Sequence, residues 1–220
     1  MAHVSPRDPQ ALSSLTPLLD AVKNAMGFVP NSMLTMAHLP QLPVAFSLLA
    51  NTVFGGDLQA QLDQLRPIVP GAENADPLEP SLIQLVALAV SLASGCRYCQ
   101  AHTSHGAHQR GVDAAKISDV LRYESSPHFS DAERAALALA FAAGRVPNES
   151  DQQHFAALRE HFSEPQIVQL VAVIALFGFL NRWNDTLATA IEAQPLDFAT
   201  EHLAELQWLP GKHFIEDQQF

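Results

Sequence analysis

The arrangement of apolar residues constrains the fold of this chain more than any other feature. Segments such as "SLIQLVALAVSLAS" (81–94) and "LVAVIALFGFL" (170–180) follow helical periodicity, and no β-branched run alternates convincingly with polar residues. We therefore predict an all-α, multi-helix bundle. The run 170–180 is far shorter than the roughly 20 residues that span a bilayer, so we interpret it as a buried helix.

The 220 residues fit one large domain or two small ones, and we predict a single helical domain. The loop 66–80, which contains four prolines, is the best internal boundary. Within the domain we expect an N-terminal helical segment at 12–66, a core at 80–122, C-terminal helices at 130–193 and a short tail at 194–220. The expected helices are 12–26, 31–37, 41–53, 57–65, 81–94, 96–110, 114–121, 130–144, 151–162 and 163–185, with one turn near 202–206.

Helix starts are marked by two capping-box patterns. Ser130 with Glu133 and Ser163 with Gln166 each place a hydroxyl three residues before a Glu or Gln. At the other end, Gly111 is the expected C-terminal cap of the helix at 96–110.

Composition limits the classes of partner. The formal net charge of −11 leaves no basic stripe to meet the phosphates of nucleic acid or an anionic membrane. Charged residues make up only 16% of the chain and hydrophobic residues 48%, so we expect a homo-oligomer that buries apolar surface. The N-terminus "MAHVSPRDPQALSSL" lacks the apolar region of a signal peptide, and two cysteines do not make a disulfide scaffold. We expect a cytoplasmic protein.

The sequence also contains a weak internal similarity between two segments. Residues 80–103 align without gaps on residues 165–188, with six identities among 24 positions. If this is a structural repeat, two copies of a helical unit would pack pseudo-symmetrically. The second copy would place Asn181 and Asn184 at the positions that the cysteines occupy in the first.

Both cysteines lie in the stretch "SGCRYCQAHTSHGAH" (94–108). Gly95 ends one helix, so Cys96 lies at or near the start of the next and Cys99 within its first turn. The free N–H groups and the dipole at a helix N-terminus stabilise a thiolate there, and Arg97 adds positive charge. This argument favours Cys96 as the more acidic thiol.

The spacing of the cysteines allows a disulfide cycle, because residues three apart on a helix lie within reach of each other. His102 follows Cys99 by one turn, where an imidazole could accept or return a proton. This combination is typical of a thiol peroxidase or a disulfide-exchange protein.

Three other interpretations compete with this one. A thioredoxin-like fold would need a strand before the CxxC, and an apolar helix precedes it here. A metal site at Cys96, Cys99, His102 and His105 would need a further ligand such as His128 or His161, because one helix cannot converge all four side chains on one ion. Two structural cysteines are the third interpretation. We expect His105 and His108 to be surface or packing residues.

The segment "LVALAVSLASGCRYCQAHT" resembles the CxxC segment of the AhpD-like, carboxymuconolactone decarboxylase superfamily, in its alkylhydroperoxidase or peroxidase-related branch. "GFVPNSMLTMAHLPQLPVAF" (27–46) and "FLNRWNDTLA" (179–188) resemble two further segments of that branch, in the same order. The resemblance implies an AhpD-like fold, homo-oligomers and reduction of hydroperoxides by the dithiol. It also implies that Cys99 is the peroxidatic nucleophile and Cys96 its resolving partner, opposite to the argument from the helix dipole.

The sequence departs from the family's proton relay at two positions. Gln84 stands where relatives place a glutamate, and Thr103 where they place a histidine. An amide cannot relay a proton as a carboxylate does, and a threonine is no base near neutral pH. Either His102 replaces the histidine, or Gln84 and Thr103, with Tyr98, only orient water or peroxide.

We therefore predict a thiol-dependent peroxidase that reduces organic hydroperoxides, needs no cofactor or metal, and is reset by an external dithiol. The alternative from another class is a dithiol–disulfide exchange protein or redox sensor. A decarboxylase of the same superfamily ranks lower, because it would make no use of the cysteines. Arg182 and Asp185, one turn apart, are expected to form an internal ion pair.

Overall fold

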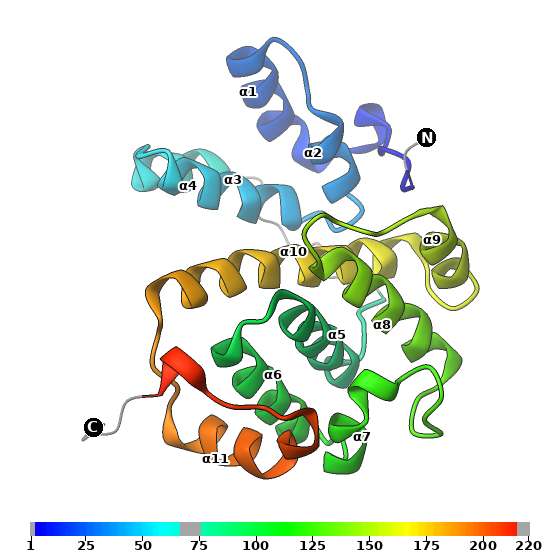
Figure 1. The fold of residues 1–220 in the computed structure, drawn as a ribbon. Helices are drawn as coiled ribbons and strands as arrows, with labels where there is room; N and C mark the ends of the chain where they lie inside the picture. Colours follow the sequence, from blue (N-terminus) through cyan, green and yellow to red (C-terminus); the bar gives the residue numbers. More distant parts are fainter. Residues whose placement is uncertain (1–2, 67–75, 215–220) are drawn as a thin grey trace. The chain divides into compact units, whose positions relative to one another are not determined.

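The computed structural model describes residues 3–66 and 76–214, and every regular element within these ranges is a helix (Figure 1). The all-α prediction is confirmed. The contacts within the chain define two compact units, Met1–Pro77 with Glu164–Gln169 and Leu78–Ser163 with Leu170–Phe220. Their boundary falls in the proline-rich loop, of which residues 67–75 lie outside the described part of the chain. The single domain stays a prediction.

The first unit contains the four helices expected there. They are α1 (Thr16–Met26), α2 (Asn31–Met36), α3 (Leu42–Val53) and α4 (Leu58–Leu65). α1 ends at Gly27, whose φ of 84° is left-handed and suits a residue without a Cβ. The buried core of this unit comprises Leu12, Leu15, Leu18, Leu19, Met33, Leu34, Ala37, Val44 and Leu65.

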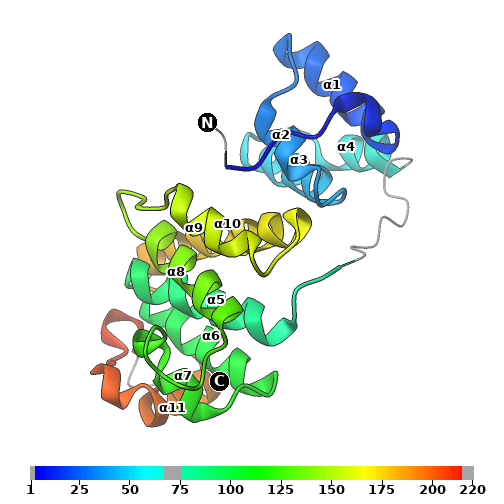
Figure 2. The same cartoon turned by 90° about the vertical axis from the view of Figure 1, so that its right-hand side faces the viewer.

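The second unit is organised around α5 (Pro80–Ser94), which packs against α6 (Arg97–Gln109) and α8 (Asp131–Gly144) (Figures 1 and 2). Every residue of α5 from Leu85 to Ser91 is buried. A Cβ at Gly144 would lie 3.2 Å from the Val90 backbone, so the close approach of α8 to α5 depends on this glycine. The other helices are α7 (Ala114–Ser118), α9 (Gln152–Arg159), α10 (Glu164–Leu187), which belongs to both units, and α11 (Ala193–His202).

The first capping-box prediction is confirmed. Ser130 Oγ accepts a hydrogen bond from the Glu133 N–H at 3.3 Å, and the Glu133 carboxylate accepts one from the Ser130 N–H at 2.8 Å. A second box, which the sequence analysis missed, opens α9. There Asp151 accepts from the His154 N–H, and His154 Nδ1 accepts from the Asp151 N–H, both at 3.2 Å. The imidazole of His154 takes the place of the usual Glu or Gln, so the sequence does not match the capping-box pattern. The box at Ser163 stays a prediction.

The tail contains more helix than the sequence predicted. The expected turn near 202–206 is present as a 3-10 helix at Ala204–Leu206, but α11, a ten-residue helix that ends at His202, precedes it. Pro195 lies in its first turn, where a missing N–H is tolerated, but the proline and the mixed polarity hid the helical pattern. Phe198 of α11 is buried against the histidines of α6.

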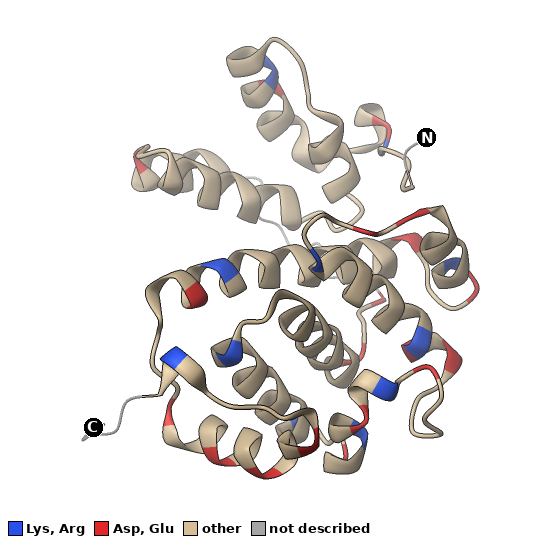
Figure 3. Cartoon of the chain, viewed as in Figure 1, with Lys and Arg blue, Asp and Glu red and all other residues tan. Residues whose placement is uncertain are grey.

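α10 is not the buried helix that the sequence predicted. Ile174 is buried, but Leu176 and Phe179 are 53% and 44% exposed. Charged residues occur only near its two ends (Figure 3). The 24-residue helix is long and apolar enough to cross a membrane by length and composition, a test that core helices of soluble proteins also pass.

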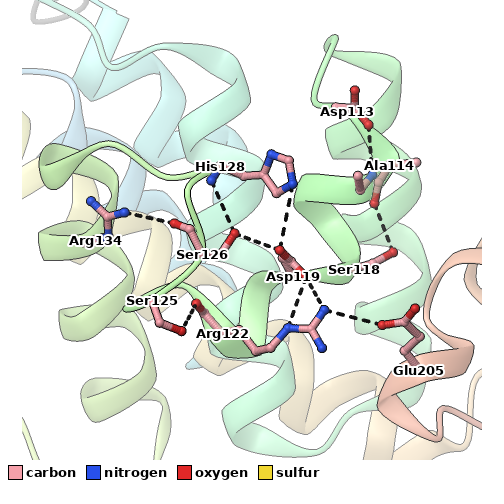
Figure 4. Close-up of polar contacts among 11 residues, drawn as sticks. Asp113, Ala114, Ser118, Asp119, Arg122, Ser125, Ser126, His128, Arg134 and Glu205 are labelled. Atoms are coloured by element: carbon pink, nitrogen blue, oxygen red, sulfur yellow. Dashed lines mark hydrogen bonds and ion pairs between the residues drawn. The ribbon is translucent and has the colours of Figure 1, made fainter.

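A polar network holds the segment that precedes α8 (Figure 4). The Asp119 carboxylate accepts hydrogen bonds from the Arg122 guanidinium and, at 2.7 Å, from Ser126 Oγ. His128 Nε2 lies 3.9 Å from the same carboxylate. Arg134 donates to the carbonyl of Ser126 at 2.9 Å, which ties the segment to α8.

We expect Asp119→Asn to lower the free energy of unfolding near neutral pH but not in acid. The hydrogen bonds from Arg122 and Ser126 hold the pKa of Asp119 below its usual value of 3.8. This contribution is present above that pH and is lost as the pH falls through the folded-state pKa. Urea unfolding followed by circular dichroism, at a series of pH values, measures the difference between wild type and variant. A difference of the same size in acid would contradict the assignment.

Candidate functional site

The two cysteines lie at the junction between α5 and α6. Gly95 ends α5 with a φ of 80°, and Cys96 occupies the N-cap of α6 in an extended conformation, with φ −74° and ψ 104°. Cys99 lies in the first turn. Both are free thiols and are 1% and 3% exposed, respectively. The sequence therefore predicted this local geometry correctly.

The geometry makes the two thiols chemically unequal. Cys96 Sγ accepts a hydrogen bond from the Cys99 N–H at 3.4 Å, as the oxygen of a capping side chain would. The hydrogen bond from the Cys99 thiol, together with this N–H, lowers the pKa of Cys96 despite its burial. The same thiol contact, burial and the negative charge on Cys96 raise the pKa of Cys99. Cys96 is thus the more acidic of the two thiols, in line with the helix-dipole argument.

Asn184 of α10 also contacts the dithiol. Its Nδ2 donates to Cys99 Sγ at 3.6 Å. In the internal alignment Asn184 is the counterpart of Cys99, so two aligned positions are in contact. The two aligned segments differ in backbone, because α10 runs unbroken through Leu180, whereas Gly95 ends α5 at the aligned position.

The predicted ion pair between Arg182 and Asp185 is wrong. Arg182 Nη1 donates to the Gly178 carbonyl, and Asp185 instead lies 2.9 Å from Lys212 Nζ and 3.4 Å from His213 Nε2. The hydrogen bond from Lys212 lowers the pKa of Asp185, and His213 acts in the same direction. The charges of Asp185 and Lys212 act on Cys96 with opposite signs. The tail therefore contributes to the electrostatics of the dithiol.

His213 was not recognised in the sequence as part of the site. Its side chain is only 1% exposed, and Nδ1 lies 2.7 Å from the Thr189 carbonyl. A carbonyl can only accept, so the proton on Nδ1 is fixed and Nε2 faces Asp185. Only tertiary structure brings these residues together.

The structure gives His102 a carboxylate partner. His102 Nε2 lies 2.6 Å from Glu192 Oε2, and Tyr98 donates to Glu192 Oε1 at 3.3 Å. The Tyr98 and His102 rings stack with centroids 4.2 Å apart. Burial and the neighbouring Glu192 raise the pKa of Tyr98 to about 12, so the phenol keeps its proton near neutral pH.

Gln84 and Thr103 both lie against the backbone of α6. Thr103 Oγ1 donates to the Cys99 carbonyl at 2.7 Å, so its hydroxyl proton is already used in a hydrogen bond to the backbone. Gln84 Oε1 lies against Gly106, where a Cβ would come within 2.7 Å of it. His102 with Glu192 is therefore an imidazole–carboxylate pair to which neither Gln84 nor Thr103 belongs.

The remaining histidines do not assemble a metal site. Within residues 3–66 and 76–214, no group of three or more His, Cys, Asp or Glu side chains could hold a metal ion. His105 and His108 contact the Phe198 ring, as expected for packing residues. His128 lies by Asp119, and His161 contacts the ring of its neighbour Phe162.

Comparisons with known proteins agree with this geometry. The profile of the carboxymuconolactone decarboxylase family matches residues 64–142, which include the dithiol. The uncharacterized protein YnjA of Escherichia coli (strain K12) is 32% identical over 111 residues, which are 50% of this chain and 61% of that protein. The chain thus matches less than two thirds of this relative's length.

Among the solved structures that resemble the chain are those of two other proteins. The apo debrominase Bmp8 is 33% identical with a TM-score of 0.55, over 90% of this chain and 96% of Bmp8. Bmp8 has also been solved with one cysteine replaced by alanine, in complex with 2,3,4-tribromopyrrole. A protein of unknown function from Agrobacterium tumefaciens, proposed as an antioxidant defence protein AhpD, is 25% identical with a TM-score of 0.50, over 53% of this chain and 80% of that one.

The helical fold, the dithiol at a helix start, the family profile and these structures lead to one assignment. The chain belongs to the AhpD-like carboxymuconolactone decarboxylase superfamily.

Proposed function

We propose that this protein is a thiol-dependent peroxidase that reduces organic hydroperoxides through Cys96 and Cys99. The observation that carries the proposal is the inequality of the two buried thiols, with a lowered pKa at Cys96 and a raised pKa at Cys99. A thiolate is the reactive nucleophile, and an adjacent protonated thiol is suited to resolve its oxidised form. The membership in the superfamily supports this choice of chemistry.

The proposed cycle uses two electrons from the dithiol. The Cys96 thiolate attacks the terminal oxygen of the hydroperoxide, the O–O bond breaks, and the alkoxide leaves and takes up a proton as an alcohol. Cys96 is then a sulfenic acid. Cys99 gives up its proton and attacks Cys96 Sγ, water leaves, and a disulfide forms. An external dithiol reduces this disulfide and restores both thiols.

This order of attack differs from the one that the resemblance implies. The resemblance makes Cys99 the nucleophile, which would first require the Cys99 proton to move to a base. The lowered pKa of Cys96 supports attack by Cys96 without that step. We also propose, from composition and family resemblance alone, a homo-oligomer located in the cytoplasm.

A second candidate function is reductive dehalogenation, which the likeness to Bmp8 over nine tenths of the chain favours. A thiolate can attack the bromine of a bromoaromatic compound; the C–Br bond breaks and the carbon takes up a proton. The second thiol then displaces bromide from sulfur and forms the same disulfide. Both functions oxidise the dithiol by two electrons, so the substrate decides between them.

We expect one equivalent of cumene hydroperoxide to consume both thiols of the reduced wild-type protein within seconds. The intramolecular Cys96–Cys99 disulfide should form without crosslinked chains, as judged by thiol counting and non-reducing electrophoresis. Cys96→Ser should not react at a comparable rate. Thiols that survive for many minutes would refute the peroxidase and leave disulfide exchange or dehalogenation as the role of the dithiol. Bromide release from tribromopyrrole with loss of both thiols would then identify a debrominase.

We expect His102→Gln and Glu192→Gln each to slow peroxide-dependent disulfide formation by about 10²-fold, the usual contribution of a positioned acid or base. The 2.6 Å contact orients the imidazole one turn after Cys99. His105→Gln is the matched control, because His105 lies on the same helix but contacts Phe198. Stopped-flow kinetics measure the rates. Equal effects at His102 and His105 would remove His102 from the proton transfer.

A further inference from the structure

Asn181 is a buried amide whose polar atoms form no hydrogen bond with the described residues. It lies on α10 and is 3% exposed, yet neither Nδ2 nor Oδ1 has a hydrogen-bond partner among the described residues. An unsatisfied buried polar group costs about 1–3 kcal/mol, so native structures rarely keep one without a reason. An amide that offers one donor group and one acceptor is suited to a ligand that carries both.

Asn181 lines a cavity of about 420 Å³ within the second unit. The cavity lies between the end of α5, with Ala93 and Ser94, and the end of α8, with Ala143 and Gly144. Its volume is in the range of small-molecule sites.

The cavity continues into a larger apolar groove of about 1020 Å³. The two share several lining residues, among them Ile174 and Gly178 of α10. Outward from these, the groove is lined by Val171, Phe179 and Trp183. Together they form one cleft with the Asn181 amide at its inner end and aromatic side chains at its outer end.

The inner end of this cleft is linked to the dithiol through neighbouring residues, although neither cysteine lines it. Asn181 lies one turn before Asn184, which donates to Cys99 Sγ. Ser94 in the cavity wall is followed directly by Gly95 and Cys96. Asp185, whose charge acts on Cys96, also lines the cavity.

We propose that this cleft binds the substrate, with Asn181 as the residue that positions its reacting end. The inference rests on the proposed peroxidase function and deepens it. The substrate class is an organic hydroperoxide with a bulky apolar or aromatic body. Asn181 Oδ1 accepts the hydroperoxide O–H and Nδ2 donates to a peroxide oxygen, while the organic group occupies the groove.

The first test measures binding without chemistry. 2-Phenyl-2-propanol, the alcohol formed from cumene hydroperoxide, has the same body and a hydroxyl that both donates and accepts. We expect reduced wild-type protein to bind it, and Asn181→Leu to bind about tenfold more weakly, by isothermal titration calorimetry. Leucine is close in size and removes an unsatisfied amide, so stability should be retained or raised. In wild type, the side-chain amide signal of Asn181 in an NMR spectrum should shift on titration.

The second test separates positioning from a general structural effect. Asn181→Leu should raise KM for cumene hydroperoxide with little change in the rate at which iodoacetamide alkylates Cys96. Alcohol binding that is absent, or equal in both proteins with an unmoved Asn181 signal, would overturn the inference. Failure of the peroxidase function itself would give a different result. The wild-type protein would bind the alcohol, but its thiols would survive treatment with cumene hydroperoxide.

Discussion

The hydrogen bond from the Cys99 N–H to Cys96 Sγ is the interaction on which the proposed chemistry depends. It exists because Gly95 turns the chain out of α5 through a left-handed φ and leaves Cys96 as the N-cap of α6. At that position a side chain meets unpaired N–H groups, and a sulfur that accepts from one is stabilised as a thiolate. The same geometry keeps the proton on Cys99.

Two distant parts of the chain complete this local arrangement. α10 contributes Asn184 against Cys99 and Asp185 near Cys96. The tail contributes Lys212, which forms an ion pair with Asp185 and offsets its charge, and His213, whose Nε2 lies 3.4 Å from the same carboxylate. The electrostatic balance at the dithiol is therefore a property of the folded second unit and not of the CxxC segment alone. Loss of the Lys212 contact would leave Asp185 as an uncompensated negative charge that disfavours the thiolate.

Local signals predicted most of the fold. The helix start at Ser130 and the break at Gly95 follow from short-range hydrogen bonding and backbone preferences, which a few neighbouring residues determine. α11 was missed because Pro195 and mixed polarity obscure a helix that packing of Phe198 supports. The half-exposed state of α10 was missed because an apolar run alone does not say which faces are covered.

The candidate site was predicted only in its local part. Cys96, Cys99 and His102 share one short segment, so their proximity follows from helix geometry. Glu192 is 90 residues from His102 in the chain, and no local pattern marks it as the partner. The ion pair expected within α10 failed for the same reason, because Asp185 has a better-placed cation in Lys212.

The most direct measurement is the ionisation of each cysteine by itself, from ultraviolet thiolate absorbance as a function of pH. Cys99→Ser keeps the backbone N–H and a hydroxyl donor beside Cys96, whereas Cys96→Ser leaves Cys99 buried near Asp185. The account predicts a pKa for Cys96 below the usual 9.0 and a pKa for Cys99 above it. The reverse order would contradict it and restore Cys99 as the nucleophile.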